Sequence, residues 1–310
     1  MLTSKSLIRI TSSRFASSFN SSSFGNSSSS SSLSLHHDFS LARLLSPNTL
    51  PQKKTKLICT IGPASDNVKM LENMIENGLN IARINFSHDD HEIQYNKLVR
   101  IREAISNSKA EGRVGIMLDT KGPEIRTGFL EGGKIEFNKG DLVKVTSDYT
   151  VKCNKEIIAV SYQSLLQHIS VGQRILIADG SLALLVESID HENNWVVTSA
   201  LNNFVLGEKK NVNLPGVQVD LPVITEKDVH DIRDFGVKHG VDYIALSFVR
   251  GASCVERCRE VLGEEGKHIR IIPKIENEQG LENLVEIVKA SDGIMMARGD
   301  LGIFISLKKI

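Results

Sequence analysis

The sequence predicts an α/β fold: an incomplete (β/α)8 TIM-type barrel with six of its eight βα units, into which a small all-β barrel domain is inserted. Short apolar runs alternate with helical patterns over residues 53–122 and 223–310, as they do in parallel βα units. Over residues 123–222 the helical patterns give way to closely spaced turn signals between alternating strands, which is typical of a small β-barrel.

The first barrel segment is expected to hold three strands and two helices. Strands are predicted over residues 56–62, 81–87 and 114–120, and helices over 67–77 and 91–109. The first of these helices repeats apolar residues three and four positions apart and is closed by Gly78.

The second barrel segment opens with a capping-box sequence, Thr225 to Asp228, ahead of a helix that reaches residue 238. Further strands are predicted over 243–248, 270–275 and 294–297, with helices over 252–262 and 279–289. Six strands could also form an open doubly wound sheet, but no glycine-rich loop with dinucleotide spacing follows the first strand. A closed barrel needs eight strands, so we expect the barrel in this chain to be incomplete.

Residues 1–52 differ in composition from the rest of the chain. They are rich in serine, and one acid, Asp38, stands against four bases, Lys5, Arg9, Arg14 and Arg43. A segment so poor in apolar residues cannot bury enough surface to fold. Such N-termini are typical of organelle transit peptides, so we expect a disordered leader and a mitochondrial or plastid matrix location. The alternative is a disordered tail on a cytoplasmic protein.

The overall composition argues against several classes of partner. Lys plus Arg and Asp plus Glu both number 37, so no net charge favours nucleic acid, and no apolar run approaches the roughly 20 residues of a membrane span. The four cysteines, Cys59, Cys153, Cys254 and Cys258, are too few for a disulfide framework in 310 residues. Cys254 and Cys258 fit helix packing better than half of a metal site, and we expect a reducing compartment.

Candidate site residues gather at the ends of two predicted strands. Lys274 and Glu276 fall on one face at the end of strand 270–275, because side chains alternate along a strand. Asp300 follows the end of the next strand. Two acids and a lysine at neighbouring strand ends could hold a divalent metal beside an anion, whereas the simpler alternative is a solvated ion pair.

A second group of polar residues ends the strands over 81–87 and 114–120. Arg83, Asn85 and Ser87 share one face, and Ser87 is also expected to cap the next helix. Hard oxygen ligands from Asn85, Ser87, Asp119 and Thr120 could surround a hard cation. The alternatives are a half-exposed strand and an ordinary turn. In the inserted domain, the basic turn around Lys210 could reach nucleotide phosphates or could simply be a solvated loop.

Seven segments, met in this order, resemble the motifs of the pyruvate kinase family. They are CTIGP (59–63), ARINFSH (82–88), LDTKGPEIRTG (118–128), VNLPG (212–216), ALSFVR (245–250), PKIEN (273–277) and ARGDLG (297–302). The resemblance covers nearly all of residues 53–302 and includes the position and size of the inserted β domain. It implies phosphoryl transfer from phosphoenolpyruvate to ADP, giving pyruvate and ATP in glycolysis.

The resemblance also implies site roles. Catalytic roles fall on Arg83 and Lys274, which with Gly299 and Asp300 would contact phosphoenolpyruvate. Glu276 and Asp300 would hold Mg²⁺ or Mn²⁺, and K⁺ would be held by Asn85, Ser87, Asp119 and Thr120. The nucleotide, ADP or ATP, would lie against Asn85, His88, Arg126 and Lys210. Glu124 implies dependence on potassium, and a full-length relative would form a homotetramer.

The chain departs from the family pattern near its end. Phe304 and Ser306 stand where the family has Glu and Pro. The chain has no counterpart of three features of the family: the last two barrel strands, a proton-donating threonine and a C-terminal regulatory domain. We therefore expect the 310-residue chain alone to be inactive. One alternative is another barrel enzyme acting on phosphoenolpyruvate or a 2-oxo acid, against which the β insertion and Lys210 argue. The other is a non-catalytic remnant that binds nucleotide or a full-length partner.

Overall fold

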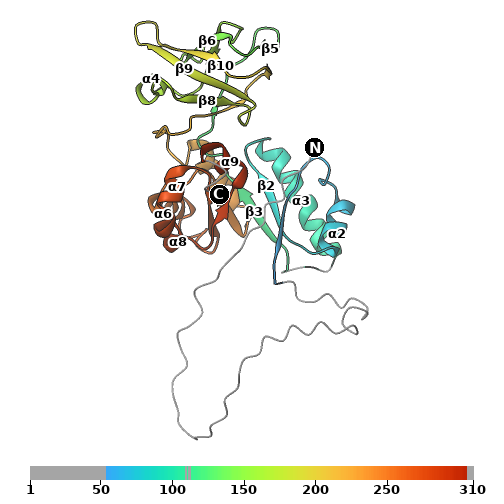
Figure 1. Ribbon diagram of the computed structural model, residues 1–310. Helices are drawn as coiled ribbons and strands as arrows, with labels where there is room; N and C mark the ends of the chain where they lie inside the picture. The colour runs from blue at the N-terminus through green and yellow to red at the C-terminus, as the bar shows by residue number, and fades with distance from the viewer. Residues whose placement is uncertain (1–53, 109, 111–112, 306–310) are drawn as a thin grey trace, which may run out of the picture.

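The computed structural model describes residues 54–108, 110 and 113–305, and it forms a β-rich part stacked on an α/β part (Figure 1). The predicted leader, residues 1–52, lies outside the described residues, as does Ser306. Between residues 54 and 305 no described helix is both long and apolar enough to cross a bilayer.

The α/β part is built on one six-stranded sheet in which all neighbouring strands are parallel. Its strands, in spatial order, are β1 (Leu57–Thr60), β2 (Leu79–Asn85), β3 (Gly115–Asp119), β13 (Tyr243–Leu246), β14 (Arg270–Ile275) and β15 (Met295–Met296). The spatial order is also the sequence order, whereas a doubly wound sheet reverses its order at a switch point. The sheet is therefore six consecutive strands of a TIM-type barrel, as predicted, and the doubly wound alternative is excluded.

Helices connect these strands on the outer side of the sheet (Figure 1). They are α2 (Val68–Glu76), α3 (His91–Asn107), α5 (Glu226–His230), the π-helix η1 (Asp231–Val237), α6 (Ala252–Leu262), α7 (Glu278–Glu282) and α8 (Leu284–Ala290). One more helix, α9 (Arg298–Phe304), follows β15 and faces the β-rich part. The predicted capping box is confirmed, because Thr225 and Asp228 exchange side-chain-to-backbone hydrogen bonds at the start of α5.

The structure differs from the sequence-based expectations in three local details. The single helix expected over 279–289 is two helices, α7 and α8, which meet at Asn283. The helix that follows Thr225 changes to π-helical hydrogen bonding from Asp231 onward. Asp300 follows the end of strand β15, as predicted, but it lies on the helix α9, which was not predicted.

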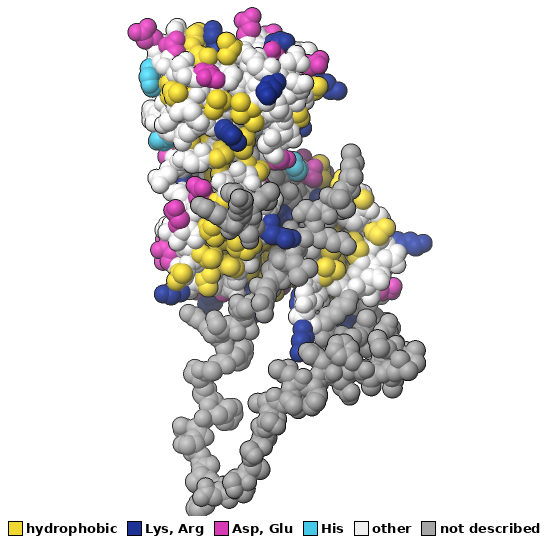
Figure 2. Space-filling view, viewed as in Figure 1, with side chains coloured by type: hydrophobic (Ala, Val, Ile, Leu, Met, Phe, Trp, Pro, Cys, Tyr) yellow, Lys and Arg dark blue, Asp and Glu magenta, His cyan; other side chains and the backbone are white. Residues whose placement is uncertain are grey.

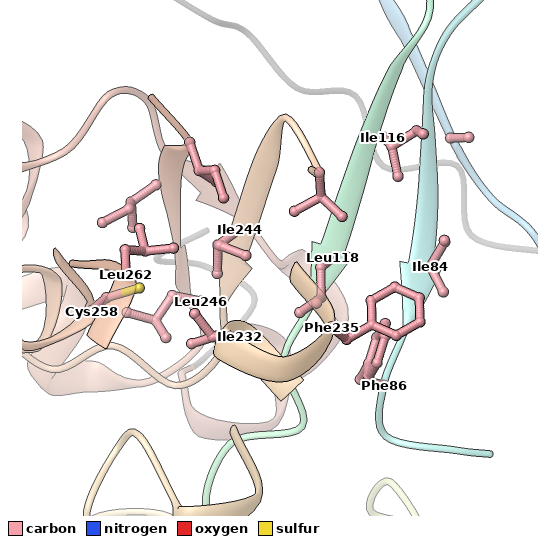
Figure 3. Packing of buried hydrophobic residues seen from close by; sticks show 14 of the residues in the cluster. Ile84, Phe86, Ile116, Leu118, Ile232, Phe235, Ile244, Leu246, Cys258 and Leu262 are labelled. Atoms are coloured by element: carbon pink, nitrogen blue, oxygen red, sulfur yellow. The ribbon is translucent and has the colours of Figure 1, made fainter. Parts of the chain in front are cut away.

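A hydrophobic core fills the space between the sheet and its helices (Figure 3). Ile84 and Phe86 from strand β2 and its end are fully buried there, and the ring of Phe86 meets that of Phe235 edge-on at 4.9 Å. The alternation predicted for residues 81–87 is confirmed, and Arg83 and Asn85 consequently project from the opposite face of β2.

The β-rich part has a seven-stranded sheet in the order β4-β12-β8-β9-β10-β6-β7 and a two-stranded sheet of β5 and β11. The strands are β4 (Ile125–Arg126), β5 (Lys134–Phe137), β6 (Leu142–Thr146), β7 (Ile157–Ala159), β8 (Arg174–Ile177), β9 (Leu182–Asp190), β10 (Trp195–Ala200), β11 (Phe204–Gly207) and β12 (Asn211–Asn213), and one short helix is present, α4 (Leu165–His168).

This part has its own core and its own entry and exit. Its buried apolar side chains form a cluster separate from that of the α/β part. Strand β4 pairs with β12, so the chain leaves the β-rich part beside the point where it enters. The residue limits 123–222 stay a prediction. Figure 2 shows acidic and basic side chains interspersed over the visible face of this part.

Candidate active site

Lys274 lies at the centre of a buried polar cluster at the carboxyl ends of β3, β13 and β14. Its Nζ is 3.2 Å from Oδ1 of Asp119, 3.0 Å from Oε1 of Glu276 and 3.0 Å from Oγ of Ser247. All four residues are less than 10% exposed. The prediction that Lys274 and Glu276 share a face is confirmed, and the register of adjacent parallel strands adds the other two residues.

Burial and charge act differently on the two titrating groups of this cluster. Burial alone would lower the pKa of the Lys274 ammonium, but the facing carboxylates of Asp119 and Glu276 outweigh it and raise that pKa. Burial raises the pKa of Glu276 to about 7; Lys274 opposes this rise, while the charge of Asp300 adds to it. Lys274 therefore stays positively charged. A further cation bound beside Glu276 would lower the pKa of its carboxyl group and so favour the carboxylate.

Arg83 brings a second cation to the same acid from strand β2. Its guanidinium forms an ion pair with Asp119, with Nε at 2.5 Å from Oδ2, and its Nη1 donates to Oγ1 of Thr60 at 2.6 Å. The Arg83 side chain is 27% exposed, whereas that of Asp119 is 1% exposed. One buried carboxylate thus holds Lys274 and Arg83 side by side, and the exposed edge of Arg83 remains available to an anion.

Two residues that the sequence reasoning did not single out complete the cluster. The Ser247 hydroxyl donates a hydrogen bond to the carbonyl of Thr120 at 2.5 Å and accepts one from the Lys274 ammonium. The backbone N–H of Phe248 donates to Oε2 of Glu276 at 2.7 Å. Both lie in the segment 245–250, which is one of the seven family-like segments but for which the resemblance implies no role for either residue. The pairing of β3 with β13 was the missing signal, because it places this segment beside Asp119.

Asp300 lies on helix α9 and lines a cavity of about 200 Å³ between the two parts of the molecule. Glu124 and Asn213 line the same cavity from the β-rich part, and Phe248 and Phe304 line it from the α/β part. Because the charge of Asp300 helps to raise the pKa of Glu276, the two carboxyl groups act on each other electrostatically.

These two carboxylates are the candidate ligands for a divalent cation. Among the described residues, no three His, Cys, Asp or Glu side chains converge closely enough to bind a metal without other ligands. Glu276 and Asp300 would therefore supply two ligands, and water or substrate oxygens would supply the others, which is the usual arrangement for Mg²⁺. The cation would also offset the burial of Glu276 and its repulsion from Asp300, which together raise the pKa of Glu276.

The structure brings together part of the predicted monovalent-cation set. Asn85 and Asp119 are register partners across β2 and β3, and Oδ1 of Asn85 accepts the N–H of Ser87 at 3.0 Å. The Thr120 hydroxyl accepts the N–H of Ser247 at 3.0 Å. The prediction that Ser87 caps the next helix was wrong: Asp90 caps α3 and accepts the N–H of its third residue at 3.0 Å.

The predicted nucleotide residues form two pairs, one on each part of the molecule. Arg126 and Lys210 lie close together in the β-rich part, where the guanidinium of Arg126 pairs with Glu124 and Lys210 is exposed. Asn85 is the last residue of β2, and His88 lies three residues later. The side chain of Gln94 donates a hydrogen bond to the backbone carbonyl of each, at 2.9 and 2.8 Å. Gly299, on α9, is exposed.

Comparisons with known proteins agree with this geometry. The family model of the pyruvate kinase barrel domain matches residues 52–310. The chain is 48% identical to a pyruvate kinase of Eimeria tenella over 258 residues, 83% of this chain and 48% of that protein. It is 50% identical to one of Geobacillus stearothermophilus over 261 residues, 84% of this chain and 44% of that protein. Among solved structures, a pyruvate kinase from Cryptosporidium parvum superimposes with a TM-score of 0.76 at 47% identity, covering 82% of this chain and 52% of that one.

The coverage is uneven between this chain and its relatives. A cytosolic isozyme of pyruvate kinase from Solanum tuberosum is 47% identical over 265 residues, which are 85% of this chain and 52% of that protein. The chain thus spans about half the length of the relatives it matches, while the match extends over most of the chain itself. By this similarity of sequence and structure, the chain belongs to the pyruvate kinase family.

Proposed function

We propose that the protein to which this chain belongs transfers a phosphoryl group from phosphoenolpyruvate to ADP, giving pyruvate and ATP in glycolysis. The observation that carries the proposal is the buried cluster in which Asp119 holds both Arg83 and Lys274 beside Glu276. Enzymes catalyse phosphoryl transfer by positioning the reactants and by neutralising the negative charge on the phosphoryl group that is transferred. Fixed cations in a buried site do both.

Lys274 and Arg83 would act as fixed positive charges. The carboxylates of Asp119 and Glu276 raise the pKa of the Lys274 ammonium, so Lys274 is suited to neutralising charge rather than to accepting a proton. Arg83 offers a planar guanidinium at the edge of the site, which suits two oxygens of a carboxylate or phosphate. Gly299 would add a backbone contact, and a Cβ at this position would meet nothing within 4 Å, so the space beside it is open to substrate.

The cations would occupy the two predicted sets of oxygen ligands. Glu276 and Asp300 would hold Mg²⁺ or Mn²⁺, which when bound supplies Lewis-acid stabilisation of the charge on substrate oxygens. Asn85, Ser87, Asp119 and Thr120 would hold K⁺. A monovalent ion there would add positive charge beside Asp119, where the phosphoryl group and the nucleotide meet.

ADP would lie between the two parts of the molecule. Arg126 and Lys210 would contact its phosphates from the β-rich part, and Asn85 and His88 would contact it from the end of β2. A full-length protein of this family would assemble as a homotetramer. The composition of residues 1–52 supports import into the mitochondrial or plastid matrix as part of this proposal.

A coupled assay for pyruvate from phosphoenolpyruvate and ADP, run on the whole protein with and without Mg²⁺, tests the proposal. Magnesium-dependent turnover that disappears in Lys274→Met and survives in Lys139→Met supports an enzyme, since Lys139 is exposed in the β-rich part. Binding of phosphoenolpyruvate or ADP without turnover supports the alternative, a remnant that binds its ligands. A folded chain that binds neither ligand contradicts both functions.

A further inference from the structure

Phe248 has a backbone conformation that bulky residues rarely adopt. Its φ is 55°, in the left-handed region, where the β-carbon of an ordinary residue meets the neighbouring backbone. The other described non-glycine residues with positive φ are Asp89, Ala178, Asp179, Asn194 and Lys209, so Phe248 is the one aromatic residue among them. Such conformations persist where the surrounding structure fixes them, and they cluster at functional sites.

The N–H of Phe248 points at the buried carboxyl group of Glu276. The N–H donates to Oε2 at 2.7 Å, while Oε1 lies 3.0 Å from Nζ of Lys274. Each carboxyl oxygen is therefore held by a different neighbour, one on the loop after β13 and one on β14. Together these two contacts fix the rotation and the tilt of the carboxyl group.

Gly122 has no side chain, and the ring of Phe248 occupies the space where its Cβ would lie. A Cβ at Gly122 would lie 2.9 Å from Cδ2 of Phe248, closer than real Cβ atoms approach other atoms, and 3.0 Å from Cβ of Ser247, which is tighter than most real Cβ contacts. Ser247 has little freedom to move, because its N–H donates to the hydroxyl of Thr120 at 3.0 Å and its own hydroxyl donates to the Thr120 carbonyl at 2.5 Å. An added methyl group would therefore displace the ring and the backbone of Phe248.

The loop that carries Gly122 is fixed by the start of helix α5. Oδ1 of Asp228 accepts the N–H groups of Lys121 and Gly122, both at 3.1 Å. Asp228 is fully buried, and its other oxygen belongs to the capping box with Thr225. A continuous set of contacts thus runs from the capping box of α5 through Gly122 and Phe248 to Glu276.

We infer that Gly122 and Phe248 are positioning residues, which fix the Glu276 carboxylate in the orientation that a bound divalent cation requires. The inference rests on the proposed function, because it concerns the same cation. Neither residue needs to touch the cation. Residues that orient a metal ligand typically change metal affinity by about 10- to 100-fold when they are altered.

The test compares two glycine-to-alanine variants of the whole chain. Gly122→Ala adds its methyl group against Phe248, whereas Gly240→Ala adds one at nearly the same φ, +60° against +67°, with nothing within 4 Å. Both variants carry the same conformational penalty, and only the first presses on the site. Mn²⁺ affinity, measured by electron paramagnetic resonance, should fall about 10- to 100-fold in Gly122→Ala and stay at the wild-type value in Gly240→Ala.

A rescue variant separates positioning from general destabilisation. Phe248→Gly accepts a positive φ without strain and removes the ring that the new methyl group would strike. The double variant Gly122→Ala with Phe248→Gly should therefore recover part of the lost Mn²⁺ affinity, because only the contact with Cβ of Ser247 remains. Loss of affinity through general destabilisation would persist in the double variant, or deepen, because the packing contacts of the Phe248 ring are also gone.

Hydrogen exchange of the Phe248 amide gives a readout that needs no metal. The amide should exchange about tenfold faster in Gly122→Ala than in Gly240→Ala, because its hydrogen bond to Glu276 is displaced. Equal Mn²⁺ affinity and equal exchange in these two variants would overturn the inference and leave the proposed function standing. A folded wild-type chain that binds no Mn²⁺ would instead overturn the proposed function, and the exchange rates would still decide whether Gly122 controls Phe248.

Discussion

Replacing Glu276 with Gln should change how the stability of the metal-free chain depends on pH. The ordinary pKa of this carboxyl is 4.5, and burial with the nearby charge of Asp300 raises it to about 7. At about 1.4 kcal/mol for each pKa unit, the difference corresponds to about 3 kcal/mol. The folded pKa is above the unfolded one, so the folded chain holds the proton more tightly. The stabilisation from Glu276 is therefore complete below pH 4.5 and is lost as the pH rises through about 7.

The variant lacks this titration, and Lys274 stays charged across the window in both proteins. The free energy of unfolding of Glu276→Gln minus that of the wild type should thus increase by about 3 kcal/mol between pH 4.5 and pH 8. Urea titrations followed by far-ultraviolet circular dichroism at several pH values measure this difference. Tryptophan fluorescence would not serve, because the one tryptophan, Trp195, lies in the β-rich part. A difference that stays constant within about 0.5 kcal/mol would refute the buried, charge-coupled environment assigned to Glu276.

Two further predictions concern the stability of the fold, and a third concerns the targeting of the N-terminal segment. Lys274→Met should lower the free energy of unfolding by about 3–5 kcal/mol in urea titrations at pH 8, because it leaves buried Glu276 without its cation and Asp119 with Arg83 alone; a loss under 1 kcal/mol would contradict this. Phe235→Ala should cost about 3–5 kcal/mol in the same titration because it removes a buried ring from the core, whereas a change within 1 kcal/mol would show that the core is packed differently. Residues 1–52 should carry a fused fluorescent protein into mitochondria or plastids; a diffuse cytosolic signal would favour the cytoplasmic alternative.

The strand order and the pairing of Lys274 with Glu276 could be predicted from the sequence for a simple reason. Apolar runs separated by helical patterns determine parallel βα units, and alternation along a strand determines which side chains share a face. Lys274 and Glu276 lie two positions apart at a strand end, so their contact needs only this local rule. The fully buried apolar face of β2 follows from the same rule.

The roles of Ser247, Phe248 and Gly122 could not be predicted, because they depend on contacts between distant segments. The hydrogen bond from Phe248 to Glu276 joins residues 28 apart, and that from Ser247 to Thr120 joins residues 127 apart. A positive φ at phenylalanine also contradicts its ordinary preference, and tertiary contacts impose it. Helix α9 was missed for a related reason: its two glycines, in seven residues, weaken any helical pattern.

Binding of phosphoenolpyruvate to the Mn²⁺-loaded chain tests the central claim most directly, and isothermal titration calorimetry measures it. We predict that the wild type and Lys139→Met bind with the same affinity, and that Lys274→Met and Arg83→Met each lose at least about tenfold, since each removes one of the two cations that Asp119 holds. Circular dichroism identifies any variant that does not fold. If Lys274→Met does not fold, Arg83→Met provides the test, because the Arg83 side chain is partly exposed. Equal affinity in all folded variants would contradict the assignment of this cluster as the phosphoryl-binding site.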